Sequence, residues 1–156
     1  MKRSSVSHLN CSIAQSLDIV GEWWTLLVLR NILMGQRRFE AIQADLGIAR
    51  NILSDRLSTL VDNGVLERVK YQDSPPRYEY RLTEMGLELF DVLMTLMAWG
   101  DKWLSPDGPP MLLVHEGCGE TTRAVLTCEH CGEPLTARTV KLRRGPGSHR
   151  QERAAI

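Results

Sequence analysis

Two copies of a short pattern of metal-binding residue types stand in the last third of the sequence. His115-Glu-Gly-Cys118-Gly and Cys128-Glu-His-Cys131-Gly each place two ligand-type residues three positions apart, with a glycine directly after. A glycine there permits the tight turn that lets two side chains converge on one ion. We therefore predict a zinc-ribbon-like site that holds one structural zinc through His115, Cys118, Cys128 and Cys131, with His130 as the alternative to His115.

Two other interpretations of these cysteines stay open. In the first, they are incidental to a β-hairpin and oxidise only under stress. In the second, the zinc is catalytic, but a catalytic zinc keeps three protein ligands and an open position for water. The rest of the sequence shows no cluster of carboxylates or histidines for acid–base chemistry, so we do not expect an enzyme.

The fourth cysteine, Cys11, stands near the N-terminus. The pattern from Cys11 to Ser16 predicts a short helix, with Ile13, Ala14 and Leu17 facing inward. A cysteine at a helix N-terminus has its thiolate favoured by the helix dipole, which suits a redox-sensing residue. The alternative is that Cys11 is a small buried hydrophobic residue.

A polar surface suited to DNA recognition is predicted within residues 36–68. Two helices flank a turn at Gly47, and Gly64 ends the second helix before a strand. Such a pair is a helix-turn-helix, with an ordinary helical hairpin as the alternative. Apolar residues of the second helix are expected to face the core: Ile52, Leu53, Leu57, Leu60 and Val61. The opposite face carries short polar side chains that suit base edges in a major groove: Arg50, Asn51, Ser54, Asp55 and Ser58.

A β-hairpin is predicted directly after the second helix. Residues 67–82 alternate as two strands around the turn at residues 73–76, with Tyr78, Tyr80 and Leu82 on one face of the second strand. The order helix, helix, hairpin is that of a winged helix-turn-helix, although a solvated hairpin without a partner is the alternative. The expected DNA-phosphate contacts of this unit are Arg37, Arg38, Lys70 and Arg77.

Two further helices are expected to complete this unit. Residues 22–34 are apolar nearly all round, which predicts a central core helix that uses Trp23 and Trp24 in packing. Thr83 is the expected N-cap of a long helix that reaches about Leu104. One of the two apolar stripes of this helix needs a partner outside the domain, so we expect a symmetric homodimer. The stripes are Leu82, Met85, Leu89, Val92, Leu96, Trp99 and Trp103, and then Leu87, Phe90, Met94, Met97 and Ala98.

Composition and charge limit the class of protein. The 156 residues are 43% hydrophobic and 24% charged, as in ordinary globular proteins. No apolar run approaches the roughly 20 residues that span a bilayer, and the N-terminus lacks the apolar segment of a secretory signal. We expect a cytoplasmic protein without a membrane partner. Net charge is zero, and residues 36–82 hold eight basic and seven acidic side chains, which predicts modest affinity for random DNA and two units acting together.

The sequence divides by composition into five parts. We expect a flexible arm at 1–10, a winged helix-turn-helix domain with its dimerisation helix at 11–104, and a linker at 105–110. A zinc-ribbon-like β appendage is expected at 111–142 and a disordered tail at 143–156. The predicted fold is mainly α with a small β-hairpin, in the α+β class.

Five motifs in residues 11–104 match those of a known protein family. They are Cys11-Ser-Ile-Ala-x-x-Leu-Asp-x-Val-Gly-Glu-x-Trp24-Thr-Leu-Leu, Gly35-x-x-Arg38-Phe39, Leu53-Ser-Asp-Arg56-Leu57, Asp62-x-Gly64-Val-Leu-Glu-Arg68 and Pro76-Arg77-Tyr78-Glu79-Tyr80-Arg-Leu-Thr83-x-x-Gly86. With them the sequence resembles the HxlR-type winged helix-turn-helix regulators. Many members of that family have serine where this chain has Ala49, and the family pattern does not require the appendage.

The resemblance implies a bacterial homodimeric transcription factor that acts as a repressor or activator. Such proteins often respond to oxidants or electrophiles, in several cases through a cysteine placed like Cys11. We therefore expect a sequence-specific regulator that binds a double-stranded DNA operator and responds to an oxidant, an electrophile or a small molecule. Oxidation of the appendage thiols with release of zinc is a second possible switch. The alternative function is a zinc-ribbon adaptor that binds a protein and no DNA.

Overall fold

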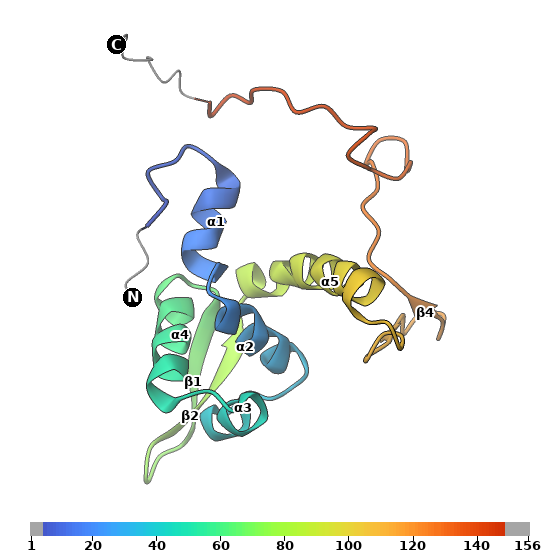
Figure 1. The fold of residues 1–156 in the computed structure, drawn as a ribbon. Helices are drawn as coiled ribbons and strands as arrows, with labels where there is room; N and C mark the ends of the chain where they lie inside the picture. The colour runs from blue at the N-terminus through green and yellow to red at the C-terminus, as the bar shows by residue number, and fades with distance from the viewer. Residues whose placement is uncertain (1–4, 149–156) are drawn as a thin grey trace. The chain divides into compact units, whose positions relative to one another are not determined.

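The computed structural model describes residues 5–148, so parts of the predicted arm (1–4) and tail (149–156) lie outside the described residues. The chain forms two compact units, one of residues 19–124 and one that combines the two ends of the chain. In chain order (Figure 1) the elements are α1 Ser12–Val20, α2 Trp23–Leu33, α3 Phe39–Leu46, α4 Arg50–Asp62, β1 Leu66–Gln72, β2 Arg77–Leu82, α5 Glu84–Leu104, β3 Leu113–Val114 and β4 Thr121–Thr122.

Residues 19–104, with the helix-turn-helix, the hairpin and α5, are called the winged unit, and helix α2 is its centre, as its apolar sequence predicts. Its residues Val28, Leu29 and Ile32 are buried in the core, and α2 contacts α3, α4, α5 and β2. Trp24 packs against this core, but Trp23 is 77% exposed. The prediction that this helix is covered on most of its surface is confirmed, with Trp23, Leu27 and the following Met34 exposed.

The helix-turn-helix forms where the glycine predicts it. Gly47 ends α3 with φ at +61°, a conformation that glycine adopts without the steric cost of a Cβ atom. Helix α4 follows with Leu53, Leu57 and Leu60 buried. The inward placement of Ile52 is wrong, because Ile52 directly precedes Leu53 and so points about 100° away from it around the helix.

The hairpin β1–β2 is antiparallel and pairs Leu66 with Leu82, which confirms the two predicted strands and their turn. The residue before α3 joins this sheet, since Arg38 bridges to Glu79 and the Tyr80 N–H donates to the Arg37 carbonyl oxygen at 2.7 Å. The start of α3 is thereby fixed to the two-stranded hairpin through this isolated bridge.

Helix α5 begins at its predicted cap. The Thr83 hydroxyl oxygen accepts from the Gly86 N–H at 3.2 Å and donates to the Gly64 carbonyl oxygen at 2.6 Å. A Cβ atom at Gly86 would collide with the Val65 carbonyl oxygen, so only glycine lets α5 lie this close to the strand. The residues of α5 that pack on the core are Leu89, Leu93 and Met94.

The division of this helix into two apolar stripes is therefore wrong. Leu89 of the first stripe and Met94 of the second both pack on the core, and so does Leu93, which belongs to neither stripe. Most of the remaining residues stay exposed: Met85, Leu87, Phe90, Val92, Leu96, Trp99, Trp103 and Leu104. None of the helices in residues 5–148 is long and apolar enough to cross a membrane.

Helix α1 is longer than the predicted Cys11–Ser16. The Cys11 carbonyl accepts from the Gln15 N–H at 3.0 Å, which makes Cys11 the residue that precedes the first turn. The inward placement of Ile13 and Leu17 is wrong: they are 72% and 45% exposed, because a periodic pattern shows which side chains share a face but not what covers it. Ala14 alone of the three is buried.

Candidate nucleic-acid interface

All five polar residues predicted on the second helix of the helix-turn-helix lie on the exposed side of α4. We call Arg50, Asn51, Ser54, Asp55 and Ser58 the polar face; each is exposed, while Leu53 and Leu57 between them are buried. Asn51, Ser54 and Ser58 line an open groove of about 860 Å³ that runs along α4 toward the hairpin. The polar face therefore has the chemistry and the access that contact with base edges requires.

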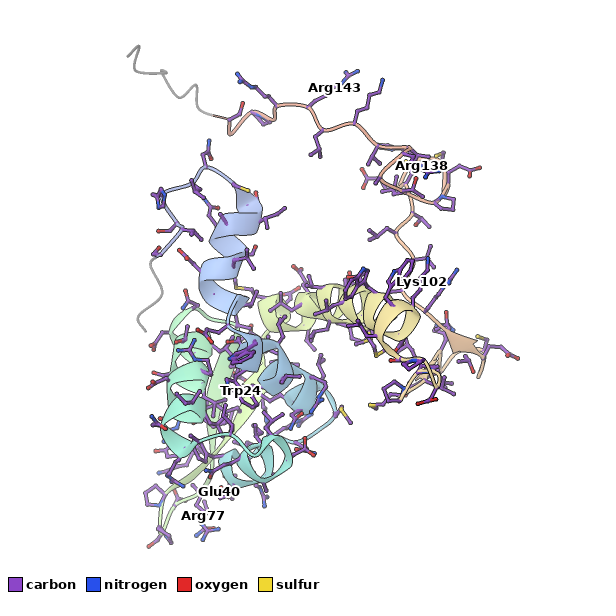
Figure 2. The ribbon with its side chains drawn as sticks, viewed as in Figure 1. Trp24, Glu40, Arg77, Lys102, Arg138 and Arg143 are labelled. Carbon is purple, nitrogen blue, oxygen red and sulfur yellow. The ribbon has the colours of Figure 1, made fainter. Side chains whose placement is uncertain are left out.

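A second open hollow lies where α3, α4 and the hairpin meet. We call it the wing groove; it has a volume of about 650 Å³ and four arginines in its lining, Arg38, Arg50, Arg68 and Arg77, against one acid, Glu40. The groove along α4 shares Arg50 and Arg68 with it. Figure 2 labels Arg77 and Glu40 at the hairpin end of the unit and Trp24 within it.

Three of these guanidinium groups stack on aromatic rings. Arg50 lies 4.8 Å from the centre of the Phe39 ring, and Arg38 lies 4.4 Å from that of Tyr71. Arg68 lies closest, at 3.6 Å from the centre of the Tyr78 ring. Stacking holds the plane of a guanidinium through its face and leaves its N–H groups at the edge free to donate.

The nearly equal numbers of basic and acidic residues in 36–82 conceal this arrangement, because several of the acids pair with cations outside the wing groove. Glu79 forms a salt bridge with Arg81 at an N···O distance of 2.6 Å, and Asp73 forms one with Lys70 at 3.0 Å. Asp45 lies in another cluster, 3.3 Å from Arg30. Positive charge is therefore concentrated in the wing groove although the segment as a whole is nearly neutral.

The predicted phosphate contacts differ in how they are placed. Arg38 and Arg77 line the wing groove, and Arg37 is exposed beside them in the chain. Lys70 is exposed but is paired with Asp73 near the hairpin turn. Arg68 is not among the predicted contacts, although the antiparallel register places it opposite Tyr80, on the hairpin face of Tyr80 and Tyr78.

A polar cluster beneath the interface connects α2 to the end of α3. Asn31 is 1% exposed, and its side-chain N–H groups donate to Asp45 at 2.8 Å and to Gln36 at 3.1 Å. Arg30 donates to the Asn31 oxygen at 2.6 Å. The hydrogen bond from Asn31, with further contributions from Gln36 and Arg30, lowers the pKa of the Asp45 carboxyl below 3.8. The cluster thus fixes α3, and through Gly47 the start of α4.

The two metal-type hooks have the same local backbone. In the first, the Gly119 N–H donates to the His115 carbonyl oxygen at 2.8 Å, and in the second the Gly132 N–H donates to that of Cys128, also at 2.8 Å. Both glycines have φ at +73°. His115 Nδ1 lies 3.3 Å from the sulfur of Cys118.

The first hook lies in the unit of residues 19–124 and the second in the other unit. Within residues 5–148, no three His, Cys, Asp or Glu side chains gather as a possible metal site. The zinc therefore stays a prediction.

The comparisons with known proteins agree with this geometry. A family model described as "HxlR-like helix-turn-helix" matches residues 19–108, which hold the helix-turn-helix, the hairpin and α5. The chain belongs to this family. It is a helix-turn-helix transcriptional regulator of the HxlR type, in a family of regulators and not of enzymes.

Relatives of this HxlR-type protein fall into two groups by the extent of the match. The uncharacterized HTH-type transcriptional regulator Rv3095 of Mycobacterium tuberculosis is 50% identical over 137 residues, which are 87% of each chain. The crystal structure of PA1607 is 34% identical with a TM-score of 0.81, and the match covers 91% of this chain and 100% of that one. The redox regulator HypR in its reduced form is 27% identical with a TM-score of 0.55, over 59% of this chain and 92% of HypR.

These extents separate the winged unit from the appendage. Residues 1–110 are 110 of the 156 residues, so a match that covers 91% of the chain must extend well beyond the linker. The match to HypR covers too little to include the whole winged unit and the appendage together. The appendage is thus shared with PA1607, whereas the winged unit is what the family has in common.

Proposed function

We propose that this HxlR-type regulator binds its operator as a homodimer, with the polar face of α4 in the major groove and the wing groove against the phosphate backbone. The observation that carries the proposal is that one side of the molecule combines exposed hydrogen-bonding groups on α4 with an arginine-lined hollow next to them. Base edges set sequence preference, and phosphate contacts set orientation and general affinity.

Two copies are proposed to meet through α5. This helix keeps Phe90, Trp99 and Trp103 exposed at 40%, 55% and 64%, with other large apolar side chains between them. A contiguous apolar surface on one helix is costly in water and is relieved when a second copy covers it. A dimer also brings two helix-turn-helix units to one operator, which a nearly neutral unit needs for useful affinity for DNA.

Fluorescence anisotropy tests the DNA proposal directly. The labelled probes are a duplex from the region upstream of the protein's own coding sequence and a scrambled duplex of the same composition. Arg50→Ala should narrow the ratio of the two affinities, because Arg50 is the strongest base-edge donor of the polar face. Lys70→Ala should weaken binding to both duplexes alike, and Arg123→Ala, which removes an exposed charge after β4, should change neither.

Wild-type protein that shows no salt-dependent binding to either duplex would contradict this function and favour the adaptor alternative. Equal weakening on both duplexes for Arg50→Ala and Lys70→Ala would contradict the division of roles between base and phosphate contacts.

Cys11 is the proposed redox-sensing residue. It is exposed and directly precedes α1, and the relative HypR is described as a redox regulator with reduced and oxidised structures. A peroxide would convert the Cys11 thiolate to a sulfenic acid and release hydroxide, which changes the packing near the start of α1. Peroxide should release wild-type protein from the upstream duplex and leave Cys11→Ser bound; equal release of both would contradict the proposal.

The appendage is proposed to hold one structural zinc through His115, Cys118, Cys128 and Cys131. The hooks share one backbone conformation, and His115 already lies beside Cys118. His130, whose ring is 85% exposed and lies 3.4 Å from Glu129, is the alternative to His115. Untagged protein should contain one zinc per chain; His130→Ala should keep it, and His115→Ala should lose it. The reverse pattern would assign the ligand to His130, and no zinc in wild type would contradict the site.

A further inference from the structure

We infer that Arg68 is a phosphate-binding residue of the interface, and that Tyr78 is the positioning residue that holds its guanidinium ready. The inference rests on the proposed DNA-binding function and adds to it an interaction that the charge pattern of the sequence does not reveal. Arg68 is exposed on β1 and lines both the groove along α4 and the wing groove. A phosphate seated between α4 and the hairpin would therefore meet this guanidinium from either hollow.

The stack on Tyr78 determines how Arg68 can act. Its guanidinium lies 3.6 Å from the ring centre, the shortest of the four cation–ring distances in residues 5–148. A guanidinium held through its face keeps its edge N–H groups available for two parallel bonds to phosphate oxygens. Holding the side chain in advance also reduces the conformational entropy that binding would otherwise cost.

Lys70 provides the contrast, because it occupies the same strand and the same face two residues later. Its ammonium lies 3.0 Å from the Asp73 carboxylate, and this ion pair must be exchanged before Lys70 can bind a phosphate. Arg68 makes no salt bridge to any acid in residues 5–148. Of the two cations on this face, Arg68 is thus the one with its charge unpaired and its position fixed.

Arg50 and Arg38 extend the same arrangement. They stack on Phe39 and Tyr71, and together with Arg68 they present three guanidiniums to the wing groove. Three aromatic rings from α3 and the hairpin thus position three arginines in one hollow. Arg38 and Arg68, held at separate points, suit the adjacent phosphates of a duplex backbone better than a single small anion, whereas Arg50 on the polar face is the one proposed to contact base edges.

The test measures affinity and its salt dependence for the full-length protein with the upstream and scrambled duplexes. Arg68→Ala should weaken binding to both duplexes by about tenfold or more. It should also reduce the slope of log K against log salt by about 0.9 for each phosphate that the variant no longer neutralises. Arg123→Ala removes the same charge from an exposed position after β4 and should leave affinity and slope as in wild type.

Tyr78 is tested by a pair of variants that keep or remove the ring. Tyr78→Phe should bind as wild type, since the stack needs only the aromatic face. Tyr78→Leu should weaken binding to both duplexes severalfold and keep the wild-type slope, because the charge remains while its preorganisation is removed. Circular dichroism and thermal unfolding of each variant show whether the fold is intact, which separates positioning from a merely structural role.

The outcomes separate this inference from the proposed function. If wild type binds both duplexes and Arg68→Ala binds like Arg123→Ala, the inference is wrong and the function stands. If Arg68→Ala loses affinity for the upstream duplex only, with an unchanged slope, Arg68 contacts bases and not phosphates. If Tyr78→Phe loses as much affinity for the duplexes as Tyr78→Leu does, the ring does not position Arg68. If wild type binds neither duplex, the proposed function itself fails.

Discussion

The winged unit and the appendage differ in what holds them together. In the winged unit Leu29, Leu53 and Leu57 are at most 1% exposed, and helices and strand pack around one apolar core. In the appendage at 111–142 no residue is buried, and its regular structure is two residues in each of two strands. Burial of apolar side chains stabilises the first part, whereas the second has almost none to use.

The difference shows where a metal would matter. A segment that cannot bury a core needs another source of free energy, and the proposed structural zinc would supply it. The two hooks already have their glycine turns and their backbone hydrogen bonds. The winged unit needs no such addition, and the match to HypR indicates that the family fold exists without most of this segment.

The largest expected effect is the unfolding of the appendage without zinc. Cys128→Ser removes one proposed ligand, and zinc bound by such sites contributes on the order of 10 kcal/mol to folding. Hydrogen exchange should then lose protection in residues 113–135 and keep it in α2 and α4. If hydrogen exchange in residues 113–135 is the same in wild type, in Cys128→Ser and in chelator-treated protein, the appendage does not depend on zinc for its folding.

A matched pair of leucines should show the next largest effect. Leu57→Ala removes a side chain that is 1% exposed in α4 and should lower the free energy of unfolding by about 2–5 kcal/mol. Leu142→Ala changes a fully exposed leucine and should stay within about 0.5 kcal/mol of wild type. Urea unfolding monitored by tryptophan fluorescence measures both; similar destabilisation of the two variants would show that burial does not distinguish the parts.

Acid should weaken the winged unit partly through Asp45. Its pKa is lowered in the folded protein, first by the Asn31 hydrogen bond, so its carboxylate stabilises the fold above the ordinary value of 3.8. That stabilisation is lost as pH falls from there through the lowered folded pKa. Thermal unfolding of Asp45→Asn should therefore depend less on pH below about pH 4 than that of wild type. An identical pH dependence in the two proteins would show that the Asp45 carboxylate does not contribute to the acid unfolding.

Asp18 offers the matching test in the unit formed by the two ends of the chain, 1–18 and 125–156. Its pKa is lowered by the Ser5 hydroxyl, which donates at 2.6 Å, and by the Val6 N–H. Asp18→Asn should leave the acid unfolding of the winged unit as it is in wild type, if the two units are stabilised separately.

The smallest expected effect is a gain at the start of α4. Ala49 is the N-cap of this helix, with φ at −62° and ψ at 138°, and no side-chain oxygen accepts from the first turn. Ala49→Ser should raise the free energy of unfolding by about 1 kcal/mol. Because the change lies in the winged unit, it should raise the thermal midpoint of that unit and leave hydrogen exchange in the hooks unchanged; an unchanged midpoint would show that the cap is satisfied by water.

Local patterns in the sequence predicted most of the winged unit. Gly47, Gly64 and Thr83 each set an element boundary through their own conformation or side chain, so these positions can be read without knowledge of the rest of the chain. The alternation of residues 77–82 likewise fixed which side chains share a face of the hairpin. The family resemblance agreed with these boundaries.

The errors arise where the outcome depends on distant parts of the chain. Ile13 and Ile52 belong to apolar patterns, but only the tertiary fold decides which side is covered. Arg68 was missed because its stack on Tyr78 and its place beside Arg50 depend on the register of the hairpin and on its packing near α4. A count of charges along the sequence cannot show that Lys70 is paired and Arg68 is not.

We propose that two copies of this regulator place α4 in successive major grooves of one operator. Methylation protection of guanine N7 on the upstream duplex measures it most directly, because this atom lies in the major groove. Paired recognition helices should give two protected patches separated by about 10–10.5 base pairs or a multiple of that spacing, and both should disappear with Arg50→Ala. A single protected patch, or two patches that persist in Arg50→Ala, would contradict it.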